Sequence, residues 1–339
     1  MSGYLAACLR EFKQQTEAEL LIYAWPNQPD SPFDTSTFSD LGTIINRYEC
    51  NIESILHQIL AFRPTAVLAS GWRDKDYVRI CRHLKSKGIP IIAGCDTQWK
   101  GSLRQQIAVW LSPLYLQRFL DVLWVTGERQ RHLAQELGYS GDRCWDGYYA
   151  CDWPAFANSV TNPTDLNHPY FLYVGRYAPE KGIDLLADAF KNYSSNVENP
   201  WRLVCAGAGP LQDMLIAAGA EDRGFIQPHN LPILMQGASA FVLPSRFEPW
   251  GVVIQEAAAC GLPLILSDAC GAGVHLLKQY YNGYSFPSGS VNQLTEALMS
   301  IHLLNPKQQV AYRQASHELS KQYTPQRWVD TLLHGLKKL

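Results

Sequence analysis

Two glutamates eight residues apart, Glu248 and Glu256, are the residues best suited to chemistry in this chain of 339 residues. They lie in the stretch FEPWGVVIQEAAACGLP at positions 247–263, where Glu256 interrupts an otherwise apolar run. A helix that is apolar on nearly all sides should be buried, and a buried carboxylate without a partner is costly. The pattern therefore predicts a partner for Glu256, either a ligand or a cation such as Arg246.

The predicted helix begins at Gly251, and its start is suited to an anion. The first N–H groups of a helix have no partner within the helix, and the helix dipole is positive at that end. With a rise of about 1.5 Å per residue, Glu248 and Glu256 are on the order of 10 Å apart. A pyrophosphate at the helix start would lie between them, with hydroxyl groups at each end of the ligand. That layout matches a nucleoside diphosphate sugar, with ribose on Glu256 and sugar on Glu248.

Cations follow the predicted strand at residues 170–175. The strand ends at Gly175, and Arg176 and Lys181 come after it. A guanidinium forms paired hydrogen bonds with phosphate oxygens, and an ammonium is a mobile point charge. The two cations therefore predict a phosphate contact, and the alternative is an ordinary turn with two solvated side chains.

Glycines follow the next predicted strand, at residues 201–207. The sequence CAGAGP contains Gly207 and Gly209, but it has neither the spacing of the dinucleotide fingerprint nor that of the P-loop. A plain tight loop explains these glycines, and the alternative is a surface that a nucleotide base approaches closely.

Short apolar strands alternate with amphipathic segments along the whole chain, which predicts a parallel α/β architecture. The predicted strands of the first half are residues 18–25, 65–72, 89–96 and 121–128. Those of the second half are residues 170–175, 201–207, 224–227, 240–245 and 262–268. Residues 150–169, rich in Pro, Asn and Asp, are typical of a linker. We predict two Rossmann-like domains that face a cleft, with the ligand beyond the carboxyl ends of the strands.

The domain boundaries follow from this pattern. We predict an N-terminal domain at residues 1–160, a nucleotide-sugar domain at 168–320 and a C-terminal crossover helix at 321–339 that returns to the first domain. The chain opens directly on a helix-like segment, so the first strand that such a domain would contain is expected to be absent.

Composition favours a globular protein, since hydrophobic residues are 47% and charged residues 18%. The net charge of −2, from 29 basic and 31 acidic residues, argues against a nucleic-acid partner. Nine cysteines without a CxxC pair are typical of reduced thiols, and no signal peptide is visible, so we expect a cytoplasmic protein. Residues 107–125 are expected to pack inside their domain; the alternative is a membrane-surface helix with weak contact to the inner membrane.

Four stretches of the second half resemble the family 4 glycosyltransferases, which are retaining enzymes of the GT-B fold. They are VGRYAPEKG, AGAGP, LPSRFEPWGVVIQEAAACGLPLI and NGYSFPSGSVNQL, between about residues 170 and 300. The spacing from Glu248 to Glu256 is the most specific part. In the first half, GIPIIAGCDT, DVLWVTGE and DGYYACDWPAF are weaker matches.

The resemblance implies a role for each matched residue. Arg176 and Lys181 would neutralise the departing diphosphate, and Glu256 would bind ribose. Glu248 and the backbone near Trp250 would hold the donor sugar. The further donor-binding positions implied by the resemblance are Gly175, Gly207, Gly209, Gln227, Ser245, Gly251 and Val252.

This chain departs from the family at three places. The family has a Gly-Gly pair and a following Glu after the next strand, where this chain has Gly271, Ala272 and Gly273 without such a Glu. Asp96 stands where a histidine often lies beside the reacting sugar. The family's opening strand and glycine-rich loop have no counterpart before the first helical segment.

Other kinds of site fit less well. Asp74, Lys75 and Asp76 imitate a DxD metal motif, but Asp74 as a helix N-cap is a sufficient explanation. A glycosidase would place its two acids on different elements and would leave the helix start without a purpose. No strand is followed by a dinucleotide fingerprint, and no GxSxG is present.

The sequence thus predicts a metal-independent, retaining glycosyltransferase without a cofactor. Its donor would be a nucleoside diphosphate sugar, with a UDP-sugar slightly favoured, and its acceptor a glycan or a lipid-linked molecule. The alternative is a sugar-nucleotide-binding protein without transferase activity, because its acceptor side is incomplete.

Overall fold

The computed structural model describes residues 2–25, 35–157 and 168–339, and these form two compact units. The first unit contains residues 2–25, Thr35–Ala150 and Pro325–Leu339, and the second contains Cys151–Thr324. The middle of the predicted linker, at residues 158–167, lies outside the described residues. Each unit is a parallel α/β structure, which confirms the predicted pair of Rossmann-like domains.

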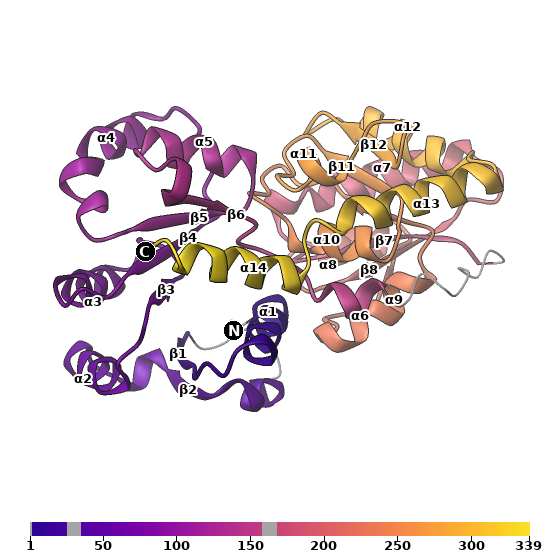
Figure 1. Ribbon diagram of the computed structural model, residues 1–339. Helices are drawn as coiled ribbons and strands as arrows, with labels where there is room; N and C mark the ends of the chain where they lie inside the picture. The colour runs from indigo at the N-terminus through magenta and orange to yellow at the C-terminus, as the bar shows by residue number, and fades with distance from the viewer. Residues whose placement is uncertain (1, 26–34, 158–167) are drawn as a thin grey trace. The chain divides into compact units, whose positions relative to one another are not determined.

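The first unit contains a four-stranded parallel sheet and a separate pair of parallel strands (Figure 1). The sheet has the order β3 (Val67–Ala69), β4 (Ile91–Cys95), β5 (Val122–Val125) and β6 (Cys144–Asp146), and the pair is β1 (Leu21–Ala24) and β2 (Thr43–Asn46). The helices are α1 (Gly3–Gln15), α2 (Ile52–Phe62), α3 (Lys75–Ser86), α4 (Leu103–Leu111), α5 (Glu128–Glu136) and α14 (Pro325–Leu336).

Side chains of the central strands alternate between two apolar clusters, one on each face of the sheet. Leu123 and Val125 of β5 join the cluster that includes α2 and α3. Val122 and Trp124 join the cluster formed with α1 and α14. Because successive side chains of a strand point to opposite faces, a sheet covered on both sides gives the continuous apolar runs seen in the sequence.

The C-terminal helix α14 packs in the first unit, as predicted. Its Trp328 is 2% exposed and stacks on Trp124 with ring centroids 4.7 Å apart. The indole N–H of Trp328 donates to the backbone oxygen of Tyr148 at 3.0 Å. Figure 1 shows α14 alongside α1, and the two helices make many contacts. The last residues of the chain therefore complete the core of the first unit.

The second unit is built on a six-stranded parallel sheet of order β12-β11-β10-β7-β8-β9. Its strands are β7 (Tyr170–Val174), β8 (Arg202–Ala206), β9 (Glu221–Asp222), β10 (Ala240–Leu243), β11 (Leu264–Ser267) and β12 (Gly283–Phe286). Its helices are α6 (Trp153–Ala157), α7 (Ile183–Asn196), α8 (Gln212–Ala217), α9 (Leu231–Gly237), α10 (Val252–Ala259), α11 (Gly273–Leu276), α12 (Val291–His302) and α13 (Pro306–Ser320).

The strand order of the second unit reverses between β7 and β10. The chain builds β7, β8 and β9 in one direction, then returns to place β10 on the other side of β7. At such a switch point the loops that leave the two neighbouring strands diverge to opposite faces and open a crevice at their carboxyl ends. The topology thus selects the loops after β7 and β10 as the place for a ligand.

Two predicted elements need correction. The strand predicted at residues 224–227 is wrong: β9 lies earlier, at Glu221–Asp222, and Gly224 takes a φ of 64° that ends the extended backbone. The amide of Gly224 instead donates a hydrogen bond to the Asp222 carboxylate at 2.9 Å. Strands β2, β6 and β12 were not predicted, because each includes exposed residues and lacks the continuous apolar run of a strand buried on both faces.

The expectation that residues 107–125 pack inside their domain holds for only part of the stretch. Leu116 and residues 119–120 are buried, as is all of β5. Ile107 and Trp110 are instead 59% and 77% exposed. Apolar periodicity identifies one face of a helix but does not say whether that face meets the core. Among the described residues, no helix has the length and apolar character needed to cross a bilayer.

All nine cysteines are free thiols, and eight of them are buried.

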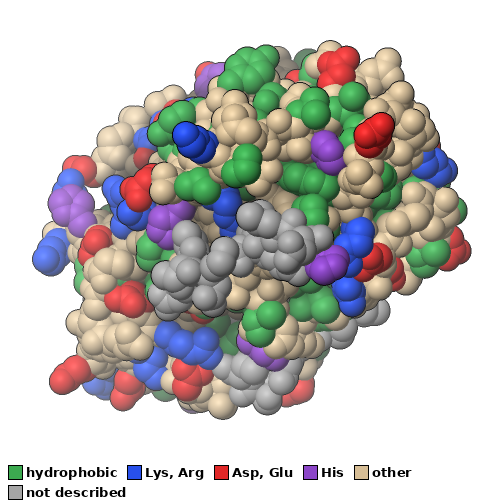
Figure 2. Space-filling view, turned by 90° about the vertical axis from the view of Figure 1, so that its right-hand side faces the viewer, with side chains coloured by type: hydrophobic (Ala, Val, Ile, Leu, Met, Phe, Trp, Pro, Cys, Tyr) green, Lys and Arg blue, Asp and Glu red, His purple; other side chains and the backbone are tan. Residues whose placement is uncertain are grey.

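On the face that Figure 2 shows, basic and acidic side chains are interspersed, which agrees with the near balance of charges in the sequence.

The packing of α14 gives a first prediction. Replacing Trp328 with Ala should lower the free energy of unfolding of the first unit by about 3–5 kcal/mol, because a buried aromatic and its hydrogen bond are both lost. Replacing the exposed Trp110 with Ala should change it by less than about 0.5 kcal/mol. Calorimetric unfolding of both variants measures the difference, and equal effects would contradict the role assigned to α14.

Candidate functional site

The loops after β7 and β10 meet at the switch point and carry the cations and acids that the sequence singled out. The first loop runs from Gly175 through the 3₁₀ turn η7 (Pro179–Lys181) to α7. The second runs from Ser245 to Gly251, the residue before α10. Both loops leave adjacent strands that pair in parallel register, so their side chains converge.

Lys181 and Glu248 form an ion pair across these two loops. The ammonium of Lys181 donates to Oε2 of Glu248 at 2.5 Å, and both side chains are largely buried. An ammonium has three N–H donors, so this contact orients Lys181 and leaves two donors for other acceptors. The structure brings together two residues that are 67 positions apart in the chain.

Arg246 does not serve as the partner of Glu256. Its guanidinium instead binds the carboxylate of Asp184 through two hydrogen bonds of 2.6 Å. It also donates to the backbone oxygen of Pro179 at 2.9 Å. The alternative of an Arg246–Glu256 pair is therefore wrong. The bound guanidinium lowers the pKa of the Asp184 carboxyl, and the bidentate pair joins the loop after β10 to the first turn of α7.

Backbone hydrogen bonds reinforce the same junction. The carbonyl of Glu180 accepts from the amides of Arg246 and Phe247, at 2.8 and 3.2 Å. Gly182 has a φ of 70°, and an added Cβ would meet the carbonyl oxygen of Pro244 at 2.2 Å. The η7 turn is thus fixed against the end of β10. Sequence reasoning did not find Asp184, because its partner Arg246 lies 62 positions away. It also missed the Glu180 carbonyl, because only the fold brings it to Arg246 and Phe247.

Glu256 is partly buried in α10 and has no protein partner within the described part of the chain. Its neighbours Gln255 and Ala257 are fully buried, and its carboxylate takes part in no hydrogen bond or ion pair. Burial raises its pKa to about 7, and the nearby carboxylate of Asp152 adds to the rise. No cation of the described residues therefore neutralises this acid.

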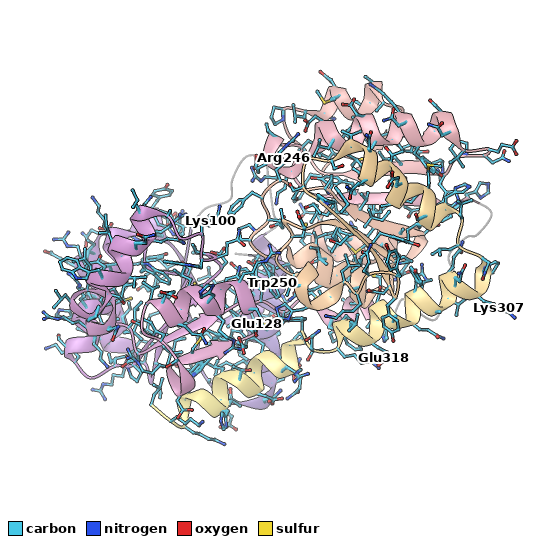
Figure 3. All side chains as sticks on the ribbon, turned by 90° about the horizontal axis from the view of Figure 1, so that it is seen from above. Lys100, Glu128, Arg246, Trp250, Lys307 and Glu318 are labelled. Carbon is cyan, nitrogen blue, oxygen red and sulfur yellow. The ribbon has the colours of Figure 1, made fainter. Side chains whose placement is uncertain are left out.

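The start of α10 has the features expected of an anion site. Gly251 takes a φ of 93°, and no side chain caps the helix. The amides of Val252 and Val253 lie in the first turn, where no carbonyl of the helix can accept them. Trp250 and Ser245 lie beside this start, 2% and 0% exposed, and Figure 3 labels Trp250. Neither the indole N–H of Trp250 nor the hydroxyl of Ser245 has a hydrogen-bond partner among the described residues.

The loop after β11 is hydrogen-bonded through its backbone to the loop after β10. The amides of Gly271 and Ala272 donate to the carbonyls of Glu248 and Trp250, each at 2.9 Å. An added Cβ on Gly271 would meet the carbonyl oxygen of Pro249 at 1.9 Å, which is too close for any side chain. Gly271 is thus required by a close backbone approach, and this loop acts on the site through its backbone.

The glycines after β7 and β8 also have a packing reason. An added Cβ on Gly207 would meet the carbonyl oxygen of Gly175 at 1.9 Å, and one on Gly209 would meet that of Tyr177 at 2.6 Å. The amide of Tyr177 donates to the carbonyl of Ala208 at 2.8 Å. The two loops therefore pack backbone against backbone, and a contact of these glycines with a base stays a prediction. Gln227 lies partly exposed, just before the turn at Pro228–Asn230.

Arg176 lies at the edge of the site and is about half exposed. Its guanidinium donates to Glu180 at 2.6 Å, and its backbone oxygen accepts from the hydroxyl of the buried Tyr173 at 2.8 Å. The backbone at Arg176 is therefore fixed, while the pair that its exposed side chain forms with Glu180 is screened by solvent.

Asp96 belongs to the first unit and follows β4. Its carboxylate accepts from the hydroxyl of Tyr149 at 3.3 Å, and its backbone oxygen accepts from Gln130 at 3.1 Å. Burial is the main cause that raises the pKa of Tyr149, and neighbouring Tyr4 and Asp96 add to it. Asp96 thus lies at the carboxyl end of its own sheet, at the position that Rossmann-like domains use for ligands.

The DxD-like segment is a helix cap, as the sequence favoured. Oδ1 of Asp74 accepts from the amides of Asp76 and Tyr77 at 2.7 and 3.0 Å, at the start of α3. Asp76 pairs with the buried Arg47 at 2.6 Å. Within the described ranges, no cluster of three or more His, Cys, Asp or Glu side chains is placed to hold a metal ion.

A family model matches the part of the sequence that contains the loops after β7 and β10. Residues 157–318, a little under half of the chain, match the family model described as glycosyl transferases group 1. Glycogen synthase of Mycobacterium tuberculosis is 33% identical over 165 residues, which cover 46% of this chain and 38% of that protein. Alpha-D-kanosaminyltransferase of Streptomyces kanamyceticus is 26% identical over 208 residues, 57% of this chain and 53% of that protein. The chain thus spans about half or less of the length of these relatives.

Solved structures resemble the whole chain. HepE of Anabaena, in complex with UDP and glucose, has a TM-score of 0.75 and 15% identity over 100% of this chain and 98% of its own. Sucrose-phosphate synthase of Thermosynechococcus elongatus has a TM-score of 0.68 and 17% identity over 94% of this chain and 87% of its own. These likenesses show the GT-B fold.

The raised pKa of Glu256 predicts a pH-dependent stability. An unfolded glutamate titrates near 4.5 and this one at about 7, so the fold favours the neutral acid and loses stability as pH rises from 4.5 to 7. Glu256→Gln, which copies the neutral acid, should therefore be more stable than the natural chain at pH 8 and nearly equal at pH 5. The gain is at most about 3–4 kcal/mol, at about 1.4 kcal/mol per pKa unit.

Urea unfolding at both pH values measures this difference. The control is Glu296→Gln, an exposed position on α12 with the same change of charge. A variant at 256 that loses the same stability at both pH values would show that the carboxylate is not strained by burial.

The close approach at Gly271 predicts that substitutions at Gly271 and at Gly273, two positions away, differ in their effect on the free energy of unfolding. Gly271→Ala should lower the free energy of unfolding by about 1–3 kcal/mol, since the loop after β10 has to move. At Gly273 an added Cβ meets only side-chain atoms, at 3.4 Å or more. Gly273→Ala should therefore stay within about 0.5 kcal/mol of the natural chain in chemical unfolding. If both variants lose the same free energy of unfolding, the close approach of Gly271 to Pro249 does not account for the loss.

Proposed function

We propose that the protein is a glycosyltransferase that moves a sugar from a nucleoside diphosphate sugar to an acceptor hydroxyl. The observation that carries the proposal is the carboxylate of Glu256. This carboxylate lies in an apolar helix and has no partner within the described part of the chain. It lies about one turn after the start of α10, where no side chain caps the helix. A ribose diol would satisfy the carboxylate while the pyrophosphate binds the N–H groups at the start of α10.

The remaining side chains of the site suit the reacting end of such a donor. Lys181 is oriented by Glu248 and keeps two N–H donors, which we assign to the β-phosphate. The exposed side chain of Arg176 supplies a second positive charge from the same loop. Fixed donors of this kind stabilise charge that develops on the departing diphosphate. Glu248 would also accept hydrogen bonds from the donor sugar, beside the backbone of Trp250 and Gly251.

We further propose that the reaction proceeds with retention of configuration and without a metal ion. Retention rests on the resemblance of the stretch from Glu248 to Glu256 to the retaining family 4 enzymes. Independence from metal rests on Lys181, Arg176 and the start of α10, which together supply the positive charge that a divalent ion would otherwise provide. Asp96 is assigned to the acceptor side, at the carboxyl end of the first unit's sheet.

A UDP-sugar is the favoured donor. HepE was solved with UDP and glucose, and it is similar in fold over the full length of this chain. The acceptor class that we propose is a glycan or a lipid-linked molecule.

Calorimetric titration with a panel of sugar nucleotides tests the proposal. At least one should bind, and Lys181→Ala and Glu256→Gln should each weaken it by about tenfold or more, as expected for the loss of one charged hydrogen bond. Lys307→Ala, an exposed site on α13 labelled in Figure 3, is the matched control and should bind normally.

Transfer from a labelled donor completes the test. Turnover that persists in EDTA supports the metal-free reaction, and turnover lost in EDTA overturns that part. Tight binding without transfer or hydrolysis identifies a sugar-nucleotide-binding protein. If no sugar nucleotide binds, the proposal is wrong.

A further inference from the structure

Helix α4 of the first unit presents its apolar side to solvent. Its apolar stripe consists of Leu103, Ile107, Trp110, Leu111 and Leu114, with the last residue in the 3₁₀ turn that follows, and we call this surface the α4 face. The five side chains are between 39% and 77% exposed. Their spacing of three and four positions is that of one side of a helix.

The opposite side of α4 faces the unit and is mostly polar. The side chain of Gln105 donates to the carbonyl of Gln98 and accepts from the amide of Lys100, each at 2.8 Å. Val109 is the residue of α4 that packs against the apolar cluster of the sheet. The helix contains no fully buried residue. Hydrogen bonds and one apolar contact thus hold α4 with its apolar face outward.

Positive charge surrounds the α4 face. Residues 77–120 contain seven Lys and Arg and one Asp, a net charge of +6, whereas the whole chain carries −2. Arg82, Arg104 and Arg118 are exposed and form no ion pair among the described residues. The guanidinium of Arg82 lies over the ring of Tyr115, 4.5 Å from its centroid. The net positive charge is therefore confined to this segment, because the rest of the chain has a net negative charge.

A hollow of about 490 Å³ lies beside the face. Its lining includes Arg82, Lys85 and Arg118 together with the apolar Leu114 and Phe119. The carboxylate of Asp121 is already held by Lys85 at 2.5 Å. The hollow therefore offers two guanidinium groups without a protein carboxylate, directly next to exposed apolar side chains.

We propose that the α4 face docks on an anionic lipid surface. Leu103, Ile107 and Trp110 enter the boundary between headgroups and acyl chains, and Arg82 and Arg118 bind lipid phosphate in the hollow. A helix with exposed apolar and aromatic side chains and flanking arginines is the kind that lies in a membrane interface. Each basic residue near an anionic leaflet contributes by electrostatic attraction, so the contact requires anionic lipid. This docking is independent of the proposed transfer reaction.

Vesicle co-sedimentation of the full chain tests the proposal. The probes are vesicles of phosphatidylcholine alone and vesicles in which phosphatidylglycerol replaces a third of it. The natural chain should sediment with the second kind, and the fraction bound should fall as salt is raised. Ile107→Ser with Trp110→Ser, and separately Arg82→Gln with Arg118→Gln, should each weaken binding by about tenfold or more.

Ile233→Ser on α9 is the matched control, since Ile233 is 70% exposed and lies in the second unit. It should bind vesicles as the natural chain does. Donor titration of every variant should be unchanged, so a failure of vesicle binding is distinguishable from a failure of the donor site. Equal sedimentation of the natural chain with both kinds of vesicle, or with neither, overturns the proposal.

Fluorescence quenching by brominated lipids provides a second measurement. Trp110 should contribute quenching that the Trp110→Phe variant lacks, because the indole lies at the depth of the bromine atoms. Analytical ultracentrifugation covers a different occupant of the same face. A natural chain that dimerises, with a monomeric Ile107→Ser and Trp110→Ser variant and no quenching, would show that a second copy covers the α4 face instead of lipid.

Discussion

The strand reversal between β7 and β10 is the constraint on which the candidate site depends. It places the carboxyl ends of β7 and β10 side by side, so that Lys181 and Glu248 meet although 67 positions separate them. The loops after β7, β8, β10 and β11 then fix one another through their backbones. Gly182 lies against Pro244, Gly207 against Gly175, and Gly271 against Pro249. The glycines of this region are therefore needed first to let backbones touch, and any contact with a ligand follows from the positions they fix.

Placement of charge follows from the same geometry. Arg246 and Asp184 neutralise each other at the rim, and Lys181 and Glu248 do so nearer to the start of α10. Glu256 has no such partner, and burial raises its pKa to about 7. An acid that costs stability without a ligand is common at functional sites, where burial and a neighbouring charge shift the pKa. The paired residues thus form the frame, and within it we propose that the carboxylate of Glu256 accepts hydrogen bonds from the ligand.

The sequence predicted the layers of the fold and the residues of the site better than it predicted their contacts. Periodicity identified the central strands, because a sheet covered on both faces needs continuous apolar runs. It missed β2 and β12, which include exposed residues, and misplaced β9, whose end is set by the turn at Gly224. Spacing identified Glu248 and Glu256, but not Asp184, since the choice of Asp184 over Glu256 as the partner of Arg246 depends on tertiary distance.

The α4 face shows a further limit of the same reasoning. Ile107, Trp110 and Leu114 have the spacing of a core-facing stripe, and the sequence assigned them to the interior. Periodicity specifies an angle around the helix axis, whereas exposure depends on how the helix is rotated about that axis. Here the rotation is set by polar contacts: Gln105 bonds to the backbone at residues 98 and 100 and turns the apolar side away from the sheet. An apolar stripe held outward by hydrogen bonds, inside a segment of net charge +6, is explained by a partner that is apolar and negatively charged at once.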